Sequence, residues 1–91
     1  MNNEGGDFES RLLGILISHP EGISEYELLT KELGLSWSSD WEMYKLHFIL
    51  FHHLYRLQRK LWGELSGDLE ISPLSIVLKA YQGKGMGLER A

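Results

Sequence analysis

A long amphipathic segment from Asp40 to Leu61 constrains the fold of this chain most strongly. Ser39 precedes it and Glu42 follows Ser39 by three residues, which is the capping-box pattern of a helix start. Within the segment, apolar side chains recur at helical spacing in two adjoining stripes. The aromatic stripe holds Tyr44, Phe48, Phe51, Tyr55 and Trp62, and the leucine stripe holds Leu50, Leu54, Leu57 and Leu61. A helix with two apolar stripes lies at the centre of a fold, or part of it contacts a partner.

Two shorter helices are predicted before this segment. The first runs over residues 7–18 and ends at His19-Pro20, because the residue before a proline is driven out of the helical region. The second runs over residues 24–33, because Ser24 and Glu27 form another capping box and a glycine follows the last leucine.

A small hairpin is predicted after the long helix. Residues 69–71 alternate between apolar and polar, Ser72-Pro73 interrupts them, and residues 74–81 resume as a second strand. A turn of helix in the second segment is the alternative. The predicted fold is mainly α with a small β-hairpin, and three helices followed by a hairpin is the order of elements in winged-helix modules.

Length and composition place these elements in one domain. The chain has 91 residues, of which 43% are hydrophobic and 24% are charged, so it is typical of a globular protein with one modest core. We expect the domain to cover residues 7–81. Residues 1–6 are predicted to form a flexible tail, and residues 82–91 a second, glycine-rich one.

The charge distribution argues against nucleic acid as the partner. The net charge is -4, whereas nucleic-acid binding needs a basic face that neutralises phosphates. A small basic cluster, Arg56, Arg59 and Lys60, lies near the end of the long helix, where it complements the helix dipole. Weak phosphate contacts are the alternative role for these three residues.

Targeting signals are not recognisable in the sequence. The polar, acidic start does not resemble a signal peptide, and histidines and an arginine interrupt the longest apolar stretch, so we expect no membrane span. The absence of cysteine fits a cytoplasmic protein.

Catalytic and metal-binding motifs are not found, and we expect no enzyme activity, no cofactor and no metal. The serines lie in predicted caps and turns, where their hydroxyls bond to the backbone. His47, His52 and His53 share the long helix, but their spacing does not give the separation of three or four residues that places two ligands on one face. Packed or surface histidines are therefore expected.

Aromatic residues of the long helix are the strongest candidates for a binding function. The two short helices offer limited apolar surface, so part of the stripe is predicted to stay exposed as a protein-binding face. The candidates are Trp41, Tyr44, Phe48 and Trp62. Core packing of most of the stripe is one alternative, and a homodimer formed through the long helix is another. A helix-turn-helix that binds DNA is a third, although that helix would then present aromatics and leucines to the groove.

Three segments in order resemble the N-terminal domain of the bacterial DnaJ-related proteins. They cover residues 20–29, 46–58 and 69–76. The resemblance implies a cytoplasmic co-chaperone in which a separate J domain recruits a DnaK-class chaperone. The chain itself is not a J domain, because His19-Pro20-Glu21 departs from the His-Pro-Asp tripeptide of J domains. What the resemblance implies here is an accessory or targeting domain that binds a client, a partner chaperone or its own J domain, and it supplies no catalytic residues.

Overall fold

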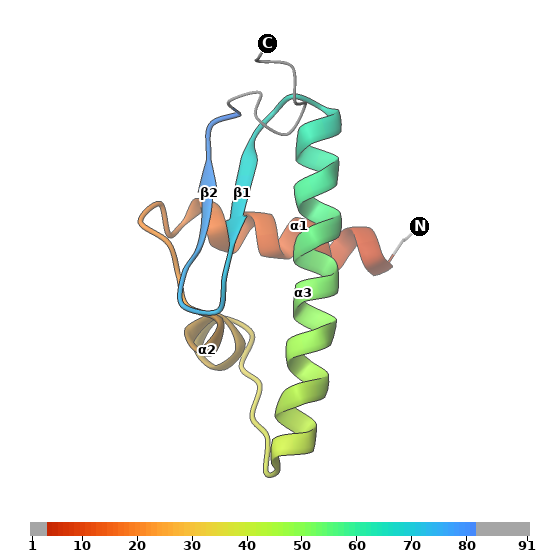
Figure 1. Ribbon diagram of the computed structural model, residues 1–91, viewed down its shortest axis with the longest axis vertical. Coiled ribbons are helices and arrows are strands. Elements are labelled where there is room, and N and C mark those ends of the chain that lie inside the picture. The colour runs from red at the N-terminus through yellow and green to blue at the C-terminus, as the bar shows by residue number, and fades with distance from the viewer. Residues whose placement is uncertain (1–3, 82–91) are drawn as a thin grey trace.

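The computed structural model describes residues 4–81 and confirms a mainly α fold with a hairpin packed against the helices (Figure 1). The elements are α1 (Glu4–Ile17), α2 (Glu25–Glu27) continued by the π-helical turn η1 (Leu28–Glu32), α3 (Asp40–Gly63), β1 (Asp68–Ile71) and β2 (Ile76–Lys79). Residues 1–3 and the predicted tail over 82–91 lie outside the described residues. No helix within the described part of the chain is long and apolar enough to cross a membrane.

Helix α1 begins at Glu4, so the predicted start at residue 7 is too late. The glycines at positions 5 and 6 explain the difference. Each disfavours helix by about 1 kcal/mol relative to alanine, which hides the helix start in the sequence, but glycine can still extend a helix that continues beyond it. The end agrees with the prediction, since His19-Pro20 follows the last turn. There the His19 ring bonds to the Ile15 carbonyl oxygen at 2.9 Å.

The second helix confirms the cap at Ser24. Its hydroxyl accepts a hydrogen bond from the Glu27 amide at 3.1 Å, and the backbone of Ser24 is extended, as an N-cap requires. From Leu28 onward the helix widens into a π-turn, in which the Leu33 amide donates to the Leu28 carbonyl. The capping pattern contained no signal for this widening. Gly34 ends the turn at φ +70°.

Helix α3 confirms the long segment and extends it to Gly63. Ser39 accepts a hydrogen bond from the Glu42 amide at 3.2 Å. The Glu42 carboxylate completes the cap one residue earlier than the motif suggests, because it accepts from the amide and the hydroxyl of Ser38 at 2.9 and 3.2 Å. These two bonds favour the ionised form and hold the pKa of Glu42 below its usual value.

The hairpin pairs β1 with β2 antiparallel, with Ile71 opposite Ile76. Its second strand begins at Ile76 rather than residue 74, because Ser72 and Ser75 exchange backbone hydrogen bonds and form the turn. The alternative of a helical turn here is wrong. Ile23, between α1 and α2, exchanges backbone bonds with Ile76 at 3.0 and 2.8 Å. This short bridge places β2 between Ile23 and β1, as in a winged-helix sheet.

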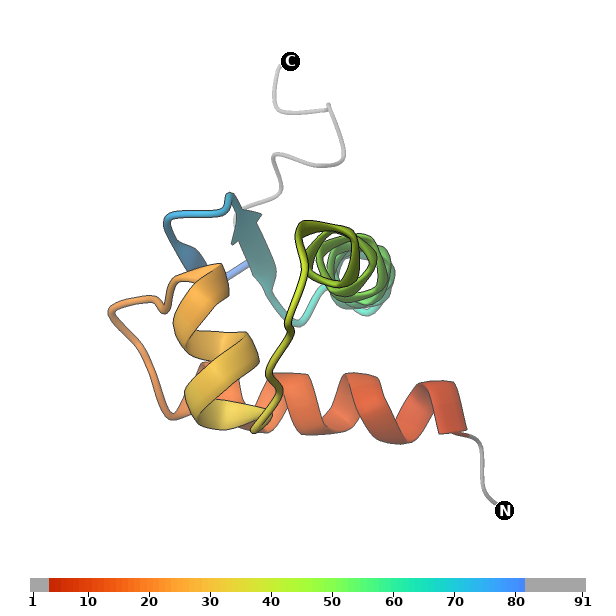
Figure 2. The same cartoon turned by 90° about the horizontal axis from the view of Figure 1, so that it is seen from below.

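Leucine and isoleucine side chains form the core where the helices and the hairpin meet. Figure 2 looks nearly along α3 and shows α1 crossing beneath it, with α2 and the hairpin on one side. The buried apolar residues are Leu12, Leu16, Ile23, Leu28, Leu29, Leu50, Leu54, Leu57, Leu61, Leu69 and Ile76. The whole leucine stripe of α3 is therefore buried, whereas the aromatic stripe lies at the edge of the core or outside it.

Candidate protein-interaction site

Three aromatic side chains at the start of α3 lie exposed and close together. Trp41, Tyr44 and Phe48 are 63%, 51% and 56% exposed. They are three and four residues apart, which places them on one side of the helix. We call these three residues the aromatic row. This end of α3 reaches beyond α2, and no element covers it in Figure 1.

The rings of the aromatic row contact one another. The Tyr44 and Phe48 centroids are 4.7 Å apart in an edge-to-face arrangement, and those of Trp41 and Tyr44 are 6.1 Å apart. Lys45 lies at the border of the row, with its ammonium 5.7 Å from the Trp41 ring centroid, and Ile49 extends the apolar surface. Exposed rings with a polar border are typical of the core of a protein–protein interface.

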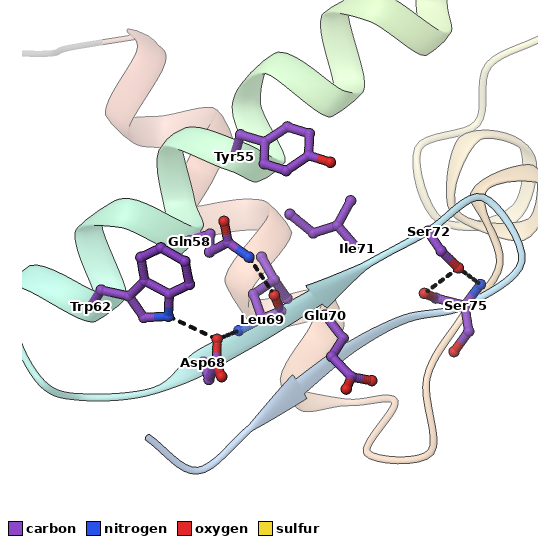
Figure 3. A pocket seen from close by; sticks show the side chains of 9 residues that line it. All are labelled: Tyr55, Gln58, Trp62, Asp68, Leu69, Glu70, Ile71, Ser72 and Ser75. Atoms are coloured by element: carbon purple, nitrogen blue, oxygen red, sulfur yellow. Dashed lines mark hydrogen bonds between the residues drawn. The ribbon is translucent and has the colours of Figure 1, made fainter. Parts of the chain in front are cut away.

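Trp62 lies apart from the aromatic row, although all four residues were predicted together. It follows Phe48 by 14 residues, or about 21 Å of helix at the usual rise. Its indole is half-buried and donates a hydrogen bond to the Asp68 carboxylate at 2.7 Å. With Tyr55 it lines a groove of about 620 Å³ between α3 and β1 (Figure 3). The helical spacing placed Trp62 on the stripe correctly, but the hairpin partly covers this end.

Two buried glutamates bind histidines of α3, and sequence reasoning missed both contacts. The His47 ring donates to the Glu25 carboxylate at 2.6 Å, and the His53 ring donates to the Glu9 carboxylate at 3.2 Å. Each glutamate is only 6% exposed. The partners are 22 and 44 residues apart, so no local motif could have indicated them. These contacts fix α2 and α1 to α3, and they support the expectation of packed histidines at positions 47 and 53.

Histidine and glutamate are also residue types that bind metal ions. Within residues 4–81, no group of three or more histidine, aspartate or glutamate side chains is arranged to hold a metal ion. His52, the third histidine of α3, is exposed.

The basic cluster lines a shallow depression of about 330 Å³ on the later half of α3, together with His52 and Glu9. Arg56 is engaged there, because its Nε lies 2.9 Å from the Glu9 carboxylate. Arg59 and Lys60 are exposed. A buried carboxylate at this place reduces the positive potential that a phosphate would meet.

Comparison with known proteins gives one finding. The family model described as "DNA-J related protein" matches residues 7–90, which is nearly the whole chain. Neither the curated proteins nor the solved structures contain a match. The match agrees with the three resembling segments.

Proposed function

The chain belongs to the DNA-J related protein family, and from this premise we propose that it is a non-catalytic protein-interaction domain, an accessory or targeting part of a DnaJ-related co-chaperone. The observation that carries the proposal is the exposure of the aromatic row. Aromatic side chains dominate the binding energy of protein interfaces, because each removes a large apolar area from water and has few rotamers to lose. The occupant would be an apolar segment of a client, of a DnaK-class chaperone or of a J domain.

Two histidines and two serines have structural roles, which supports a binding function over catalysis. His47 and His53 hold buried carboxylates, while Ser24 and Ser39 cap helices. A nucleophile needs an adjacent base that is itself oriented by a third group. The described serines and histidines form no such arrangement with one another.

Binding of defined probes tests the proposal. The probes are a permanently unfolded client (reduced, carboxymethylated lactalbumin), a DnaK-class chaperone and a J domain of the same family. We expect the 91-residue chain to bind at least one probe. The triple variant Trp41→Ser, Tyr44→Ser, Phe48→Ser should bind that probe at least about tenfold more weakly, which corresponds to about 1.4 kcal/mol.

A matched control separates the aromatic row from exposed apolar surface in general. Ile17 and Leu65 are similarly exposed but lie on other parts of the domain. The double variant Ile17→Ser, Leu65→Ser should bind as the unchanged chain does, and circular dichroism should show that both variants are folded. Absence of binding to all three probes, or equal binding by the triple variant, would refute the proposal.

The fold and the surface of α3 leave two alternative functions, which are DNA binding and dimerisation. In a winged-helix DNA-binding module, α3 would enter the major groove, and the basic cluster would contact phosphates. Against it stand the acidic net charge and the Arg56–Glu9 ion pair. Binding of a labelled DNA duplex at physiological salt would favour this alternative. A dimer formed through α3 would show in sedimentation velocity as a mass that doubles with concentration and is lost in the triple variant.

A further inference from the structure

The outer edge of β1 carries a backbone pair that faces away from the sheet. In an antiparallel ladder, the backbone groups of alternate residues point to opposite edges. The Ile76 amide donates to the Ile23 carbonyl, and the Ile76 carbonyl accepts from the Ile23 amide. Both groups therefore point away from Ile71, the residue opposite Ile76 in β1. The amide and the carbonyl of Ile71 must therefore point to the outer edge, toward the groove beside α3.

Side chains close this edge at Leu69 but not at Ile71. The Leu69 amide donates to the Asp68 carboxylate at 2.8 Å, and the Leu69 carbonyl accepts from the Gln58 amide at 2.6 Å (Figure 3). At Ile71, two residues further, no hydrogen bond to the outward pair is found among residues 4–81. An open backbone pair on an edge strand is a template for another strand.

The groove beside this open pair has an apolar wall and room for a peptide. Tyr55 and Trp62 of α3 face it from one side and Ile71 from the other, within a volume of about 620 Å³ (Figure 3). In an added strand, side chains alternate between the two faces, so one in two can enter such a groove. Strand addition of this kind obtains affinity from backbone bonds and selectivity from the side-chain pocket.

Charge at the groove selects the occupant. Asp68 and Glu70 are the carboxylates that line it, and none of its lining residues is Lys, Arg or His. Glu70 is already paired with the Lys79 ammonium at 2.7 Å, so Asp68 is the acid that an occupant would meet. Among the contacts of residues 4–81, only one oxygen of Asp68 is engaged, by the Leu69 amide and the Trp62 indole. A basic side chain on the occupant would therefore meet complementary charge.

We propose that the outer edge of β1 at Ile71 binds a short extended peptide segment of a partner polypeptide, in which an apolar residue neighbours a Lys or Arg. The segment pairs with the Ile71 backbone as a third strand beyond β1. Its apolar side chain packs between Tyr55 and Trp62, and its basic side chain lies near Asp68. This site is separate from the aromatic row, so it adds to the proposed function without depending on it.

A peptide titration of the full 91-residue chain, followed by amide chemical shifts, tests this site. The probe is a capped hexapeptide of alternating valine and lysine, and the matched control has glutamate in place of lysine. We expect saturable shifts at Glu70, Ile71 and Ser72. The glutamate peptide should bind at least about fivefold more weakly, as should a valine–lysine peptide that is N-methylated at the amides facing the edge.

Two variants make the outcome decisive. Tyr55→Ser removes the exposed wall of the groove and should weaken binding of the valine–lysine peptide at least about fivefold. The triple variant of the aromatic row should bind this peptide as the unchanged chain does. The proposal fails if no saturable shift appears up to about 5 mM peptide. It also fails if N-methylation has no effect, or if the triple variant loses binding, because the peptide would then occupy the aromatic row.

Discussion

Leu54 and Phe48 lie on the same helix and test which of its two stripes holds the fold together. Leu54 is 0% exposed, and truncation to alanine removes three carbon atoms from the centre of the core. Such changes cost about 2–5 kcal/mol, and full burial in a closely packed cluster places Leu54→Ala at about 3 kcal/mol. For a domain of this size, each kcal/mol lowers Tm by about 4–8 °C, so we expect a decrease of about 12–24 °C.

Phe48→Ala should cost far less. Phe48 is 56% exposed, so less than half of its side chain is removed from water in the native state. A fully buried phenylalanine costs about 3–5 kcal/mol on truncation, and scaling by burial gives about 1–2 kcal/mol. The higher helix propensity of alanine recovers about 0.5 kcal/mol. The net expectation is about 1 kcal/mol, one third of the cost of Leu54→Ala.

Urea unfolding followed by far-ultraviolet circular dichroism measures both variants on one scale. The comparison is repeated at several protein concentrations. Equal costs for the two variants would refute the argument that the aromatic row lies outside the core. If the cost of Phe48→Ala rose with concentration, the row would be covered by a second copy of the chain, and the dimer alternative would replace the proposed function.

Three further predictions concern backbone strain, helix propensity and pH. Gly22 has φ +101°, and a Cβ there would lie 2.8 Å from the Ser75 hydroxyl, so Gly22→Ala should destabilise by about 1–3 kcal/mol. Gly14→Ala in α1, where nothing lies within 4 Å of the added carbon, should instead stabilise by up to about 1 kcal/mol in the same urea assay. The bonds from Ser38 lower the pKa of Glu42 on folding, so their stabilisation is present at neutral pH and is lost as pH falls through the folded pKa. Glu42→Gln should therefore be less stable than the unchanged chain at pH 7, and the difference should shrink as the pH falls below the usual glutamate pKa of about 4.3. A difference that stays constant down to acid pH would contradict this account.

Local signals predicted the elements of the fold well. The caps at Ser24 and Ser39 are each specified within four residues, and the structure has both. The alternation of apolar and polar residues and the break at Ser72-Pro73 predict the hairpin. The ends of its two strands agree with this prediction to within two residues. What was missed locally was small: the earlier start of α1 and the π-turn after Leu28.

Contacts between distant segments could not be predicted in the same way. Helical spacing shows that α3 has two stripes, but which stripe meets the core depends on how α1 and the hairpin cross it. The same limit explains Trp62, which belongs to the aromatic stripe by spacing but is partly covered by β1. It also explains the buried Glu9 and Glu25, which are surface residues by type. Both are buried against α3, which supplies a histidine to each of them and Arg56 to Glu9.

The length of α3 explains why the aromatic row is left uncovered. Its 24 residues span about 36 Å, whereas each hairpin strand has four residues and spans about 13 Å. The first buried residue of α3 is Leu50, ten residues after its start, or about 15 Å along the axis. What holds this early part is the cap at Ser39, the bond from His47 to Glu25 and the packing of Leu46 against the core, none of which involves a ring of the aromatic row. The three exposed rings of the aromatic row leave apolar surface area in contact with water, which is unfavourable. A partner that covers the rings removes this area from water and offsets the free-energy cost. The interaction proposal therefore rests on this end of α3 and not on the winged-helix order of the fold, which by itself says nothing about function.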